Sequence, residues 1–540
     1  MTRPARLGLL LLIGAAALSL WSCSAGEDPT ADPSVLHRGL SSDPESLDPH
    51  KARSVQAADI LRDMGEGLLA YSASGELMPG VAESWQIAQD GKTYTFTLRD
   101  DARWSNGDPV TAEQFVFSLR RLVDPATAAF YGQMLGEIVN AREILAGDKL
   151  PGDLGVEAAG DRTLVIRLEK PVPYLLSLLT HPSAFPVHPG AIEEHGDAFA
   201  RPGRLVSNGA YMLSGWEPGA VIQLVRNPYY WDDASTSIDA VHHHVLPQEM
   251  TELNRYRAGE LHITSSVPPD SFELVRENLG DELHVAPYLG VYYYGFNLTR
   301  PPFRDSPQVR RALSMAVDRE VLVASITGRG EQPAYSWVPP GVDNYQPIQL
   351  SFASMTQDER NAVARRLLRE AGYGPDNPLS IELRYNTSDT QQRIALAIQS
   401  MWREVGVEVE LINEEFQVLL ANMRERVVTQ VFRSSWVGDY NDAHTFLSVM
   451  ESGSPSNMPG YTNSEFDSLM QRAAAQVDPK TRRLHLEEAE RVLLSDHPVI
   501  PLYFYVSKHL VSPRVRGWED NVLDYHYSRH LSLAPNDAGP

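Results

Sequence analysis

The sequence has little cysteine and little positive charge. Cys23 is the only cysteine among 540 residues, so an internal disulfide is excluded and the fold must be held by packing alone. Lys and Arg together number 47 against 70 Asp and Glu, which gives a formal net charge of −23. That balance argues against nucleic-acid binding, which needs a basic surface, and against a polybasic membrane patch.

Long hydrophobic runs are missing after the first 20 residues. The run at 7–20 follows Arg3 and Arg6, and it is too short to span a bilayer comfortably. A basic start followed by a short apolar stretch is typical of a signal peptide. We therefore predict that the chain is exported.

The apolar run ends in the letters LWSC. Leu20, Ser22 and Cys23 fit the cleavage box of a bacterial lipoprotein, in which the cysteine is acylated, although Trp21 is bulky for its position. We predict lipidation at Cys23, followed by a flexible polar tether at 24–34. Ordinary signal cleavage nearby, with an incidental cysteine, is the alternative.

Motifs of the common enzyme classes are also missing. The sequence has no Gly-x-Ser-x-Gly elbow, no phosphate-binding loop and no His-Glu-x-x-His helix. Acidic residues are numerous enough that composition alone does not exclude a glycosidase pair. We predict that the chain is not an enzyme. A secreted hydrolase is the minor alternative, which a turnover assay would detect.

What the sequence does contain is alternating strand and helix patterns, over a length that needs two or three domains. Strand periodicity occurs at 92–99, 161–169 and 220–227, and helical periodicity at 111–123, 308–327 and 358–372. Thr111 caps the first of these helices and Gly372 stops the last. The order of the patterns predicts mixed α/β domains.

Two stretches indicate that the domains are discontinuous in sequence. Residues 181–190 are rich in turn-forming residues and separate two strand-rich regions. Residues 285–298 form a long, extended aromatic run that leads into a helix-rich half. A strand that enters a new domain at such a point would serve as a hinge crossing.

Several segments resemble one family when they are taken in order. They are DPESLDPHKA (43–52), GEGLLAYSASGELMPGVAESW (65–85), LRDDARWSNGDPVTAEQFVFSLRRL (98–122), SNGAYML to RNPYYWD (207–232), LNRYRAGELHIT (253–264), RALSMAVDRE (311–320), PAYSWVPPG (333–341) and SSWVGDYNDAHTFL (434–447). Together they resemble the peptide-binding receptors of ABC importers, in the peptide/nickel-binding family of bacterial extracellular solute-binding proteins.

The resemblance implies an α/β clamp of the periplasmic-binding-protein type, with two lobes, an additional third domain and a central ligand cleft. The implied division begins with a signal peptide and lipoprotein box at 1–23 and a tether at 24–34. Lobe I then comprises three separate segments, 35–63, 189–289 and 507–540, the last of which includes the C-terminal tail. The extra domain is 64–188, and lobe II is 290–506.

The segment WVGDYNDAHTFL carries the most diagnostic part of the resemblance. Its local interpretation is an acidic loop in which Asp442 caps the next helix. In relatives the Asp of the GDYN-like motif takes the ammonium of the peptide N-terminus, and the resemblance gives that role to Asp439. It implies Trp436 as a neighbouring aromatic wall, Arg433 as a basic residue behind the strand, and Arg424 as a partner of the carboxylate of a short peptide. Further ligand-binding positions match at Val55, Tyr131, Ser265, Ser266, Tyr288 and Tyr293.

The sequence departs from relatives at other positions near this site. Gln391 stands where a close relative has His, Gly295 replaces an acidic residue, and Arg53 lies near another acidic position. A cysteine pair of some relatives appears here as Gly290 and Val437. These changes leave ligand length and side-chain preference open. Arg53 raises the hypothesis of a preference for acidic side chains.

Three consecutive histidines suggest a metal site. On a strand His242 and His244 share one face, and His243 points the other way. No acidic or cysteine ligand follows at a supporting spacing, so we expect no bound metal and no cofactor. Because some receptors of the resembled family carry nickel or haem, a receptor for a metal complex, haem or a cell-wall peptide is the alternative function.

Physical chemistry agrees with peptide capture. An extended peptide carries unpaired backbone groups that a cleft edge can satisfy whatever the sequence, and a buried ammonium needs a carboxylate partner. We predict a monomeric extracytoplasmic receptor that takes short peptides into a closing cleft and delivers them to an ABC permease. We place it in the periplasm or cell envelope, attached to the membrane by a lipid anchor.

Overall fold

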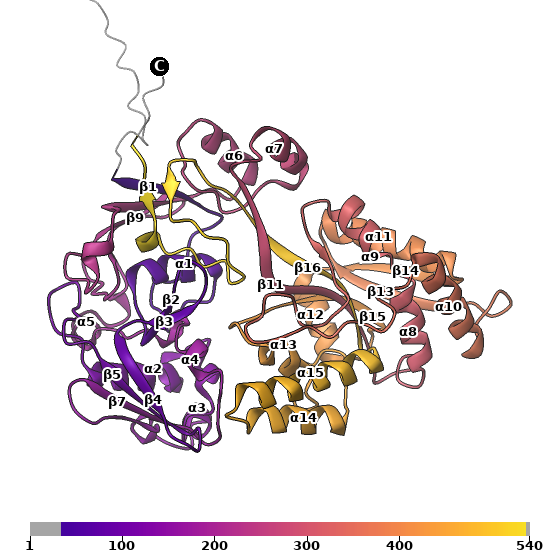
Figure 1. The fold of residues 1–540 in the computed structure, drawn as a ribbon, viewed down its shortest axis with the longest axis horizontal. Helices are drawn as coiled ribbons and strands as arrows, with labels where there is room; N and C mark the ends of the chain where they lie inside the picture. The colour runs from indigo at the N-terminus through magenta and orange to yellow at the C-terminus, as the bar shows by residue number, and fades with distance from the viewer. Residues whose placement is uncertain (1–33, 536–540) are drawn as a thin grey trace, which may run out of the picture.

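A computed structural model describes residues 34–535, arranged as two bodies joined by long strands (Figure 1). The predicted signal peptide, Cys23 and nearly all of the tether lie outside the described residues. Within residues 34–535 no helix combines the length and the apolar character needed to cross a membrane.

Lobe I is built on a sheet that joins the start of the described chain to strands much further along it. Its order is β1 (Val35–Leu40), β10 (Ala240–Val245), β9 (Val221–Arg226) and β8 (Tyr211–Glu217). β1 runs parallel to β10, and the other neighbours are antiparallel. The helix α1 (Val55–Met64) contributes its apolar side chains to the same core, as does α5 (Pro189–His195). The strand predicted at 220–227 is confirmed as β9.

The extra domain has a separate sheet and core. The sheet order is β4 (Ala82–Ile87), β5 (Thr93–Leu98), β7 (Thr163–Arg167) and β6 (Val156–Ala158). Packed on the core or beside it are α2 (Ala112–Val123), α3 (Ala141–Leu145), α4 (Leu175–Leu178) and the hairpin β2 (Leu69–Tyr71) with β3 (Leu77–Pro79). The strands predicted at 92–99 and 161–169 are confirmed as β5 and β7, and the first predicted helix is confirmed as α2, with Thr111 at its N-cap.

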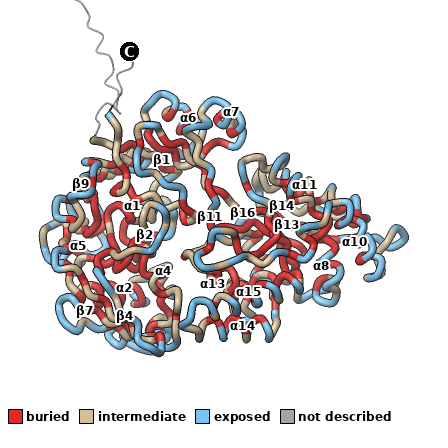
Figure 2. The backbone as a smooth tube through the Cα atoms, in the orientation of Figure 1, coloured by how far each residue is buried: buried red, intermediate tan, exposed pale blue. Residues whose placement is uncertain are grey.

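Lobe II contains the largest sheet and the largest core. The sheet order is β12 (Gln332–Pro333), β16 (Val499–Leu510), β11 (Leu283–Phe296), β15 (Val431–Val437), β13 (Leu379–Asn386) and β14 (Val407–Glu414). Its longer helices are α8 (Pro307–Met315), α10 (Gln357–Glu370), α11 (Asp389–Glu404), α12 (Phe416–Glu425), α14 (Ser464–Ala474) and α15 (Pro479–Asp496). Buried residues follow the sheets in both bodies, and exposed residues lie mainly at their outer edges (Figure 2). The helix predicted at 358–372 is confirmed as α10.

The prediction of one helix over 308–327 is wrong. The structure has α8, then α9 (Arg319–Val321) and a π-helical turn (Leu322–Thr327). Asp318 starts the second segment, because its carboxylate accepts a hydrogen bond from the Val321 N–H at 2.9 Å. The fully buried Arg319 guanidinium donates to the carbonyl oxygens of Ala334 and Pro501, both at 2.8 Å, and this anchors the break to the sheet.

Two neighbouring strands cross between the bodies, as predicted for the aromatic run at 285–298 (Figure 1). β11 and β16 pair along most of their length, but the register shifts between Pro287 and Val291. Near the crossing lie α6 (Glu249–Arg257) and α7 (Phe272–Asn278), whose small core includes Leu510. After β16 the chain returns to lobe I through β17 (Val515–Arg516) and β18 (Ser532–Leu533). A bulge in otherwise paired crossing strands is a suitable place for a hinge.

Candidate functional site

A cavity of about 330 Å³ lies between lobe I, the extra domain and lobe II. This volume falls within the range of small-ligand sites, which begins at about 300 Å³. Residues from α1, from the hinge, from the segment after β15 and from the C-terminal segment line it. They include Arg38, Arg53, Val55, Asp59, Arg62, Tyr131, His181, Ser265, Tyr288, Val437, Gly438, Asp439, His509, Asp524, Tyr525 and His526.

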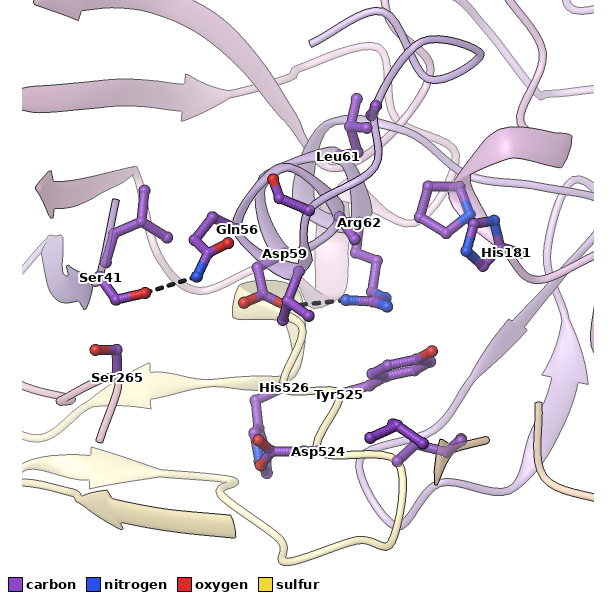
Figure 3. A pocket seen from close by; sticks show the side chains of 18 of the residues that line it. Ser41, Gln56, Asp59, Leu61, Arg62, His181, Ser265, Asp524, Tyr525 and His526 are labelled. Carbon is purple, nitrogen blue, oxygen red and sulfur yellow. Dashed lines mark hydrogen bonds and ion pairs between the residues drawn. The ribbon is translucent and has the colours of Figure 1, made fainter. Parts of the chain in front are cut away.

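The lobe I wall carries an internally paired charge cluster. Asp59 and Arg62 on α1 form an ion pair of 2.9 Å, and the Arg62 guanidinium lies 3.4 Å from the centre of the Tyr525 ring (Figure 3). Burial raises the pKa of Asp59, and the charge of Arg62 opposes that rise. On the same helix the Gln56 amide donates to Ser41 Oγ at 2.6 Å. These groups already have partners within the wall.

The C-terminal segment contributes a second paired acid. Asp524 Oδ1 lies 2.9 Å from His509 Nε2 and 3.0 Å from His526 Nε2. Although burial acts in the opposite direction, the charge of Asp524 raises the pKa of His509 to about 9. The pKa of Asp524 is lowered by His509 and His526 against the effect of burial. At neutral pH this pair is therefore an imidazolium and a carboxylate.

Asp439 differs from the other two cleft carboxylates. It follows β15 and Gly438, whose N–H donates to the carbonyl oxygen of Leu289 in the hinge at 2.8 Å. The Asp439 N–H donates to Thr445 Oγ1 at 3.2 Å, but its carboxylate has no hydrogen bond or ion pair with any residue at 34–535. Solvent in the cleft reaches this side chain, yet the surrounding walls desolvate it and raise its pKa to about 6. It is an anionic group without a local counter-charge.

Asp442, three residues later, has a structural role, but the prediction that it is the cap of the next helix is wrong, because the N-cap of α13 (His444–Leu447) is Ala443. The Asp442 carboxylate accepts from the His444 N–H at 2.8 Å and receives two hydrogen bonds from Arg482, at 2.7 and 2.8 Å. The structure thus separates the two acids. Asp442 supports the loop, and Asp439 is left facing the cavity.

The structure brings half of the predicted ligand-binding residues to the cavity. Val55, Tyr131, Ser265 and Tyr288 line it together with Asp439. Val55 is 63% exposed, at the start of α1. Tyr131 and Asp439 also border an adjoining cavity of about 650 Å³ on the side of the extra domain. The two residues therefore form a shared wall from which a ligand could extend in either direction.

The other predicted positions lie outside this lining. Tyr293 is 3% exposed and packs edge-on against Trp337 in the lobe II core, with the ring centres 4.9 Å apart. The Arg433 guanidinium lies 5.2 Å from the centre of the Tyr292 ring. Trp436 packs against the same core, and its indole N–H is buried with no partner among the described residues. Arg424 is exposed on α12, and Ser266 is half-buried beside the lining residue Ser265.

The departures from relatives have local structural explanations. Gly290 and Val437 are directly paired across β11 and β15. At Gly295 a Cβ atom would lie 2.4 Å from the Phe432 ring, so that ring occupies the space of a side chain. Gln391 accepts a hydrogen bond from the Tyr292 hydroxyl. Arg53 lines the cavity and lies 5.9 Å from the centre of the Phe130 ring.

Sequence reasoning missed the paired groups of the wall. Asp59 and Arg62 are three positions apart on α1, and charged residues at that spacing were a usable signal of an ion pair. The pairing of His509 with Asp524 and His526 had no such signal. It depends on the C-terminal segment folding back beside the end of β16, which no local pattern specifies.

Two lobes joined by crossing strands around a cleft define a solute-binding protein of the clamp type. Residues 76–458 match the family described as Bacterial extracellular solute-binding proteins, family 5 Middle. The chain is 42% identical over 508 residues to the periplasmic oligopeptide-binding protein OppA of Escherichia coli (strain K12), with 93% of each chain covered. The chain belongs to this family of extracellular solute-binding proteins. These comparisons confirm three predictions: the family, the clamp fold, and the role of a binding protein rather than an enzyme.

Solved structures show the same fold and bear on the arrangement of the lobes. The unliganded open form of the periplasmic murein tripeptide-binding protein MppA gives a TM-score of 0.85 at 37% identity, covering 93% of this chain and 98% of that chain. The Haemophilus influenzae OppA complex with RPPGFSPFR gives 0.76 at 37% identity, covering 93% and 99%. The chain therefore superposes better on that open form than on that peptide complex.

Proposed function

We propose that the protein is an extracytoplasmic receptor that captures short peptides between its lobes and delivers them to an ABC permease. Membership of the solute-binding family supports this role, as do the names of relatives that bind oligopeptides or a murein tripeptide. The cavity lies where lobe I, the extra domain and lobe II meet, so a ligand would contact both lobes at once. A ligand that binds both lobes stabilises the closed state over the open state, because its affinity for the closed state is higher.

The observation that favours a peptide as the ligand is the unpaired Asp439 carboxylate. The other two cleft carboxylates already have Arg62 or His509 as partners. A free α-ammonium is common to all unmodified peptides and would supply the missing positive charge at Asp439. Because the pair would become enclosed when the lobes close, its loss would cost several-fold to hundreds-fold in affinity. Contacts of Trp436, Arg433 and Arg424 with the ligand stay predictions.

The side-chain preference of the site is a second part of the proposal. Arg53 is exposed and lines the cavity, and no ion pair in the described structure occupies its guanidinium. We therefore expect an acidic side chain in the ligand to bind better than a basic one. Affinities for Glu- and Lys-containing tripeptides of otherwise equal sequence test this, and a preference for Lys would remove it.

We also propose that the receptor is monomeric and held at the membrane through a lipid on Cys23. The relatives are described as periplasmic, which supports an extracytoplasmic location. Expression of the full chain and of Cys23→Ser in a bacterial host tests the anchor. We expect the unaltered protein in the membrane fraction and the variant in the soluble fraction, and equal partition of both would reject lipidation.

The ligand class is tested directly on protein purified without a denaturing step. Mass spectrometry of the released ligand should detect short peptides. Isothermal titration of ligand-free protein with an unmodified tripeptide should then give saturable one-to-one binding without product formation. Release of only non-peptide molecules, together with no heat from a panel of tripeptides, would reject the proposal.

A further inference from the structure

Three histidines gather on lobe I, away from the peptide cavity. His37 Nδ1 lies 2.9 Å from His244 Nε2, and the ring centres of His37 and His242 are 5.2 Å apart. One ring nitrogen of each histidine lies within 4.8 Å of the corresponding nitrogens of the other two. The sequence offered only two histidines on one strand face. The structure adds a third from a distant segment.

The parallel pairing of β1 and β10 creates this cluster. His37 is directly opposite His242 in the register, and His244 is two residues further along the same face. His243 points to the opposite face, where its Nε2 lies 3.7 Å from Asp63. Arg38 follows His37 in β1 and lines the peptide cavity. The histidine cluster therefore faces away from the side of β1 that the peptide would use.

We propose that His37, His242 and His244 bind a divalent transition-metal ion of the zinc class. Zn²⁺ binds imidazole nitrogen at about 2.0–2.1 Å, so nitrogens in a tetrahedral site lie about 3.3 Å apart. The three candidate nitrogens now lie within 4.8 Å of one another, and metal binding would replace the hydrogen bond between His37 and His244. A set of imidazoles without carboxylate oxygen suits zinc, nickel or copper and disfavours calcium and magnesium.

The exposure of the cluster supports this assignment. His242 and His244 are half-buried and His37 is buried, so solvent reaches the cluster from the side of His242 and His244. Arg255 is the nearby cation acting on His244, and it is paired with Glu260 at 2.7 Å.

A neighbouring histidine fixes the position of the buried ligand. The backbone N–H of His37 donates to His262 Nδ1 at 3.0 Å. This bond holds the β1 backbone at the position of the buried ligand. An ion bound to all three ligands would tie β1, the first described strand, to β10. Since it would bind the folded state only, it would stabilise lobe I by an amount that rises with the logarithm of its free concentration.

The cleft contains a second group with suitable spacing, formed by His509, Asp524 and His526. That group is a weaker metal site, because His509 is held as an imidazolium by Asp524 and a protonated ring nitrogen is not a ligand. The two groups lie on different surfaces. A variant in each one therefore distinguishes the sites.

The test uses the full mature chain without a histidine tag, freed of metal by a chelator and then dialysed. Zn²⁺ titration should show one equivalent bound and a higher midpoint of thermal unfolding, and Mg²⁺ should do neither. Co²⁺ should give the visible absorption bands of a nitrogen-ligated, near-tetrahedral site. His242→Ala and His244→Gln should each weaken Zn²⁺ binding at least about tenfold, because even changes to outer-shell partners cost that much.

Two control variants complete the design. His485→Ala changes a histidine on α15, and His526→Ala changes the cleft group; both should bind Zn²⁺ as the unaltered protein does. Circular dichroism and the unfolding midpoint in chelator check that each variant is folded. Absence of Zn²⁺ binding, unchanged affinity in folded His242→Ala, or loss of binding in His526→Ala would each overturn the proposal.

Discussion

At the scale of single residues, partners distinguish the acids of the cleft. Asp59 and Asp524 have cations within 3 Å, whereas Asp439 faces the cavity without one. Two acids three positions apart in one loop also differ, since Asp442 is held by Arg482. An unpaired, desolvated carboxylate favours a bound cation more strongly than a paired one does. Asp439 is therefore the residue on which we expect ligand chemistry to depend most.

The raised pKa of Asp439 predicts a pH dependence of peptide binding. Without ligand the carboxyl group has a pKa of about 6, and below that pH it is increasingly neutral and cannot pair with an ammonium. Affinity should be nearly constant above pH 7 and about tenfold weaker at pH 5, with proton uptake by the free protein as the cause. His509 stays charged and His181 stays neutral across this window.

Isothermal titration at pH 5 and 7.5 in buffers of different ionisation enthalpy measures both the affinity and the protons released. Asp439→Asn is the matched variant, and its weak binding should not vary over this range. If the unaltered protein binds a neutral-side-chain tripeptide equally well at both pH values, Asp439 is not the group that pairs with the ligand.

The sequence could specify Asp439 because its motif is local and because it resembles a family with a known ligand anchor. It could not specify Asp59 with Arg62 as part of the cavity, since both are also plausible residues of an exposed helix face. Tyr293 was assigned by the alignment of its segment with the resembled family, and it lies in the lobe II core in this arrangement, so its contact with a ligand stays a prediction.

At the scale of elements, one buried carboxylate organises the segment that leads into the lobe II core. Glu490 on α15 is fully buried and accepts hydrogen bonds from the N–H groups of Trp337, Val338 and Ile348 at 2.7–2.8 Å. The Tyr345 hydroxyl donates to it at 2.7 Å. Burial raises the pKa of Glu490 to about 7. A segment without regular structure is thus attached to a helix by a single side chain.

Replacement of this carboxylate should destabilise lobe II. Glu490→Ala leaves three buried N–H groups unpaired, at about 1 kcal/mol or more each, so the free energy of unfolding should fall by about 3 kcal/mol. Glu488→Ala on the exposed face of the same helix is the control, and it should change stability by less than about 0.5 kcal/mol. Urea unfolding followed by tryptophan fluorescence measures both. Equal midpoints for the two variants would contradict this role.

Strands with strict alternation could be predicted at this scale, because β5, β7 and β9 are half-buried and their two faces differ. The break in the helix at 308–327 could not be predicted, because the hydrophobic period continues through it. The cause of the break is a tertiary contact, the attachment of Arg319 to carbonyl groups of other segments.

At the scale of the whole molecule, two strands connect the lobes, and their pairing is irregular where they cross. The register of β11 and β16 shifts between Pro287 and Val291, next to the cavity residue Tyr288. From lobe II only the short segment 437–439 reaches the cavity in this arrangement. Closure about the bulge would bring more of lobe II to a ligand.

Closure should be visible in solution scattering. Adding a saturating unmodified tripeptide should lower the radius of gyration, because the lobes close over the ligand and shorten the molecule. Asp439→Asn at the same peptide concentration should keep the larger radius. Saturated binding without any change in the radius would show that this protein binds peptide without closing.

The central claim is that Asp439 neutralises the free amino end of a bound peptide. The most direct test measures the affinity of one tripeptide, with a free amine and N-acetylated, for the unaltered protein and for Asp439→Asn. We predict that acetylation weakens binding about 100-fold in the unaltered protein, equivalent to nearly 3 kcal/mol, and has almost no effect in the variant. Equal affinity of both peptides for the unaltered protein, or equal discrimination by the variant, would contradict the claim.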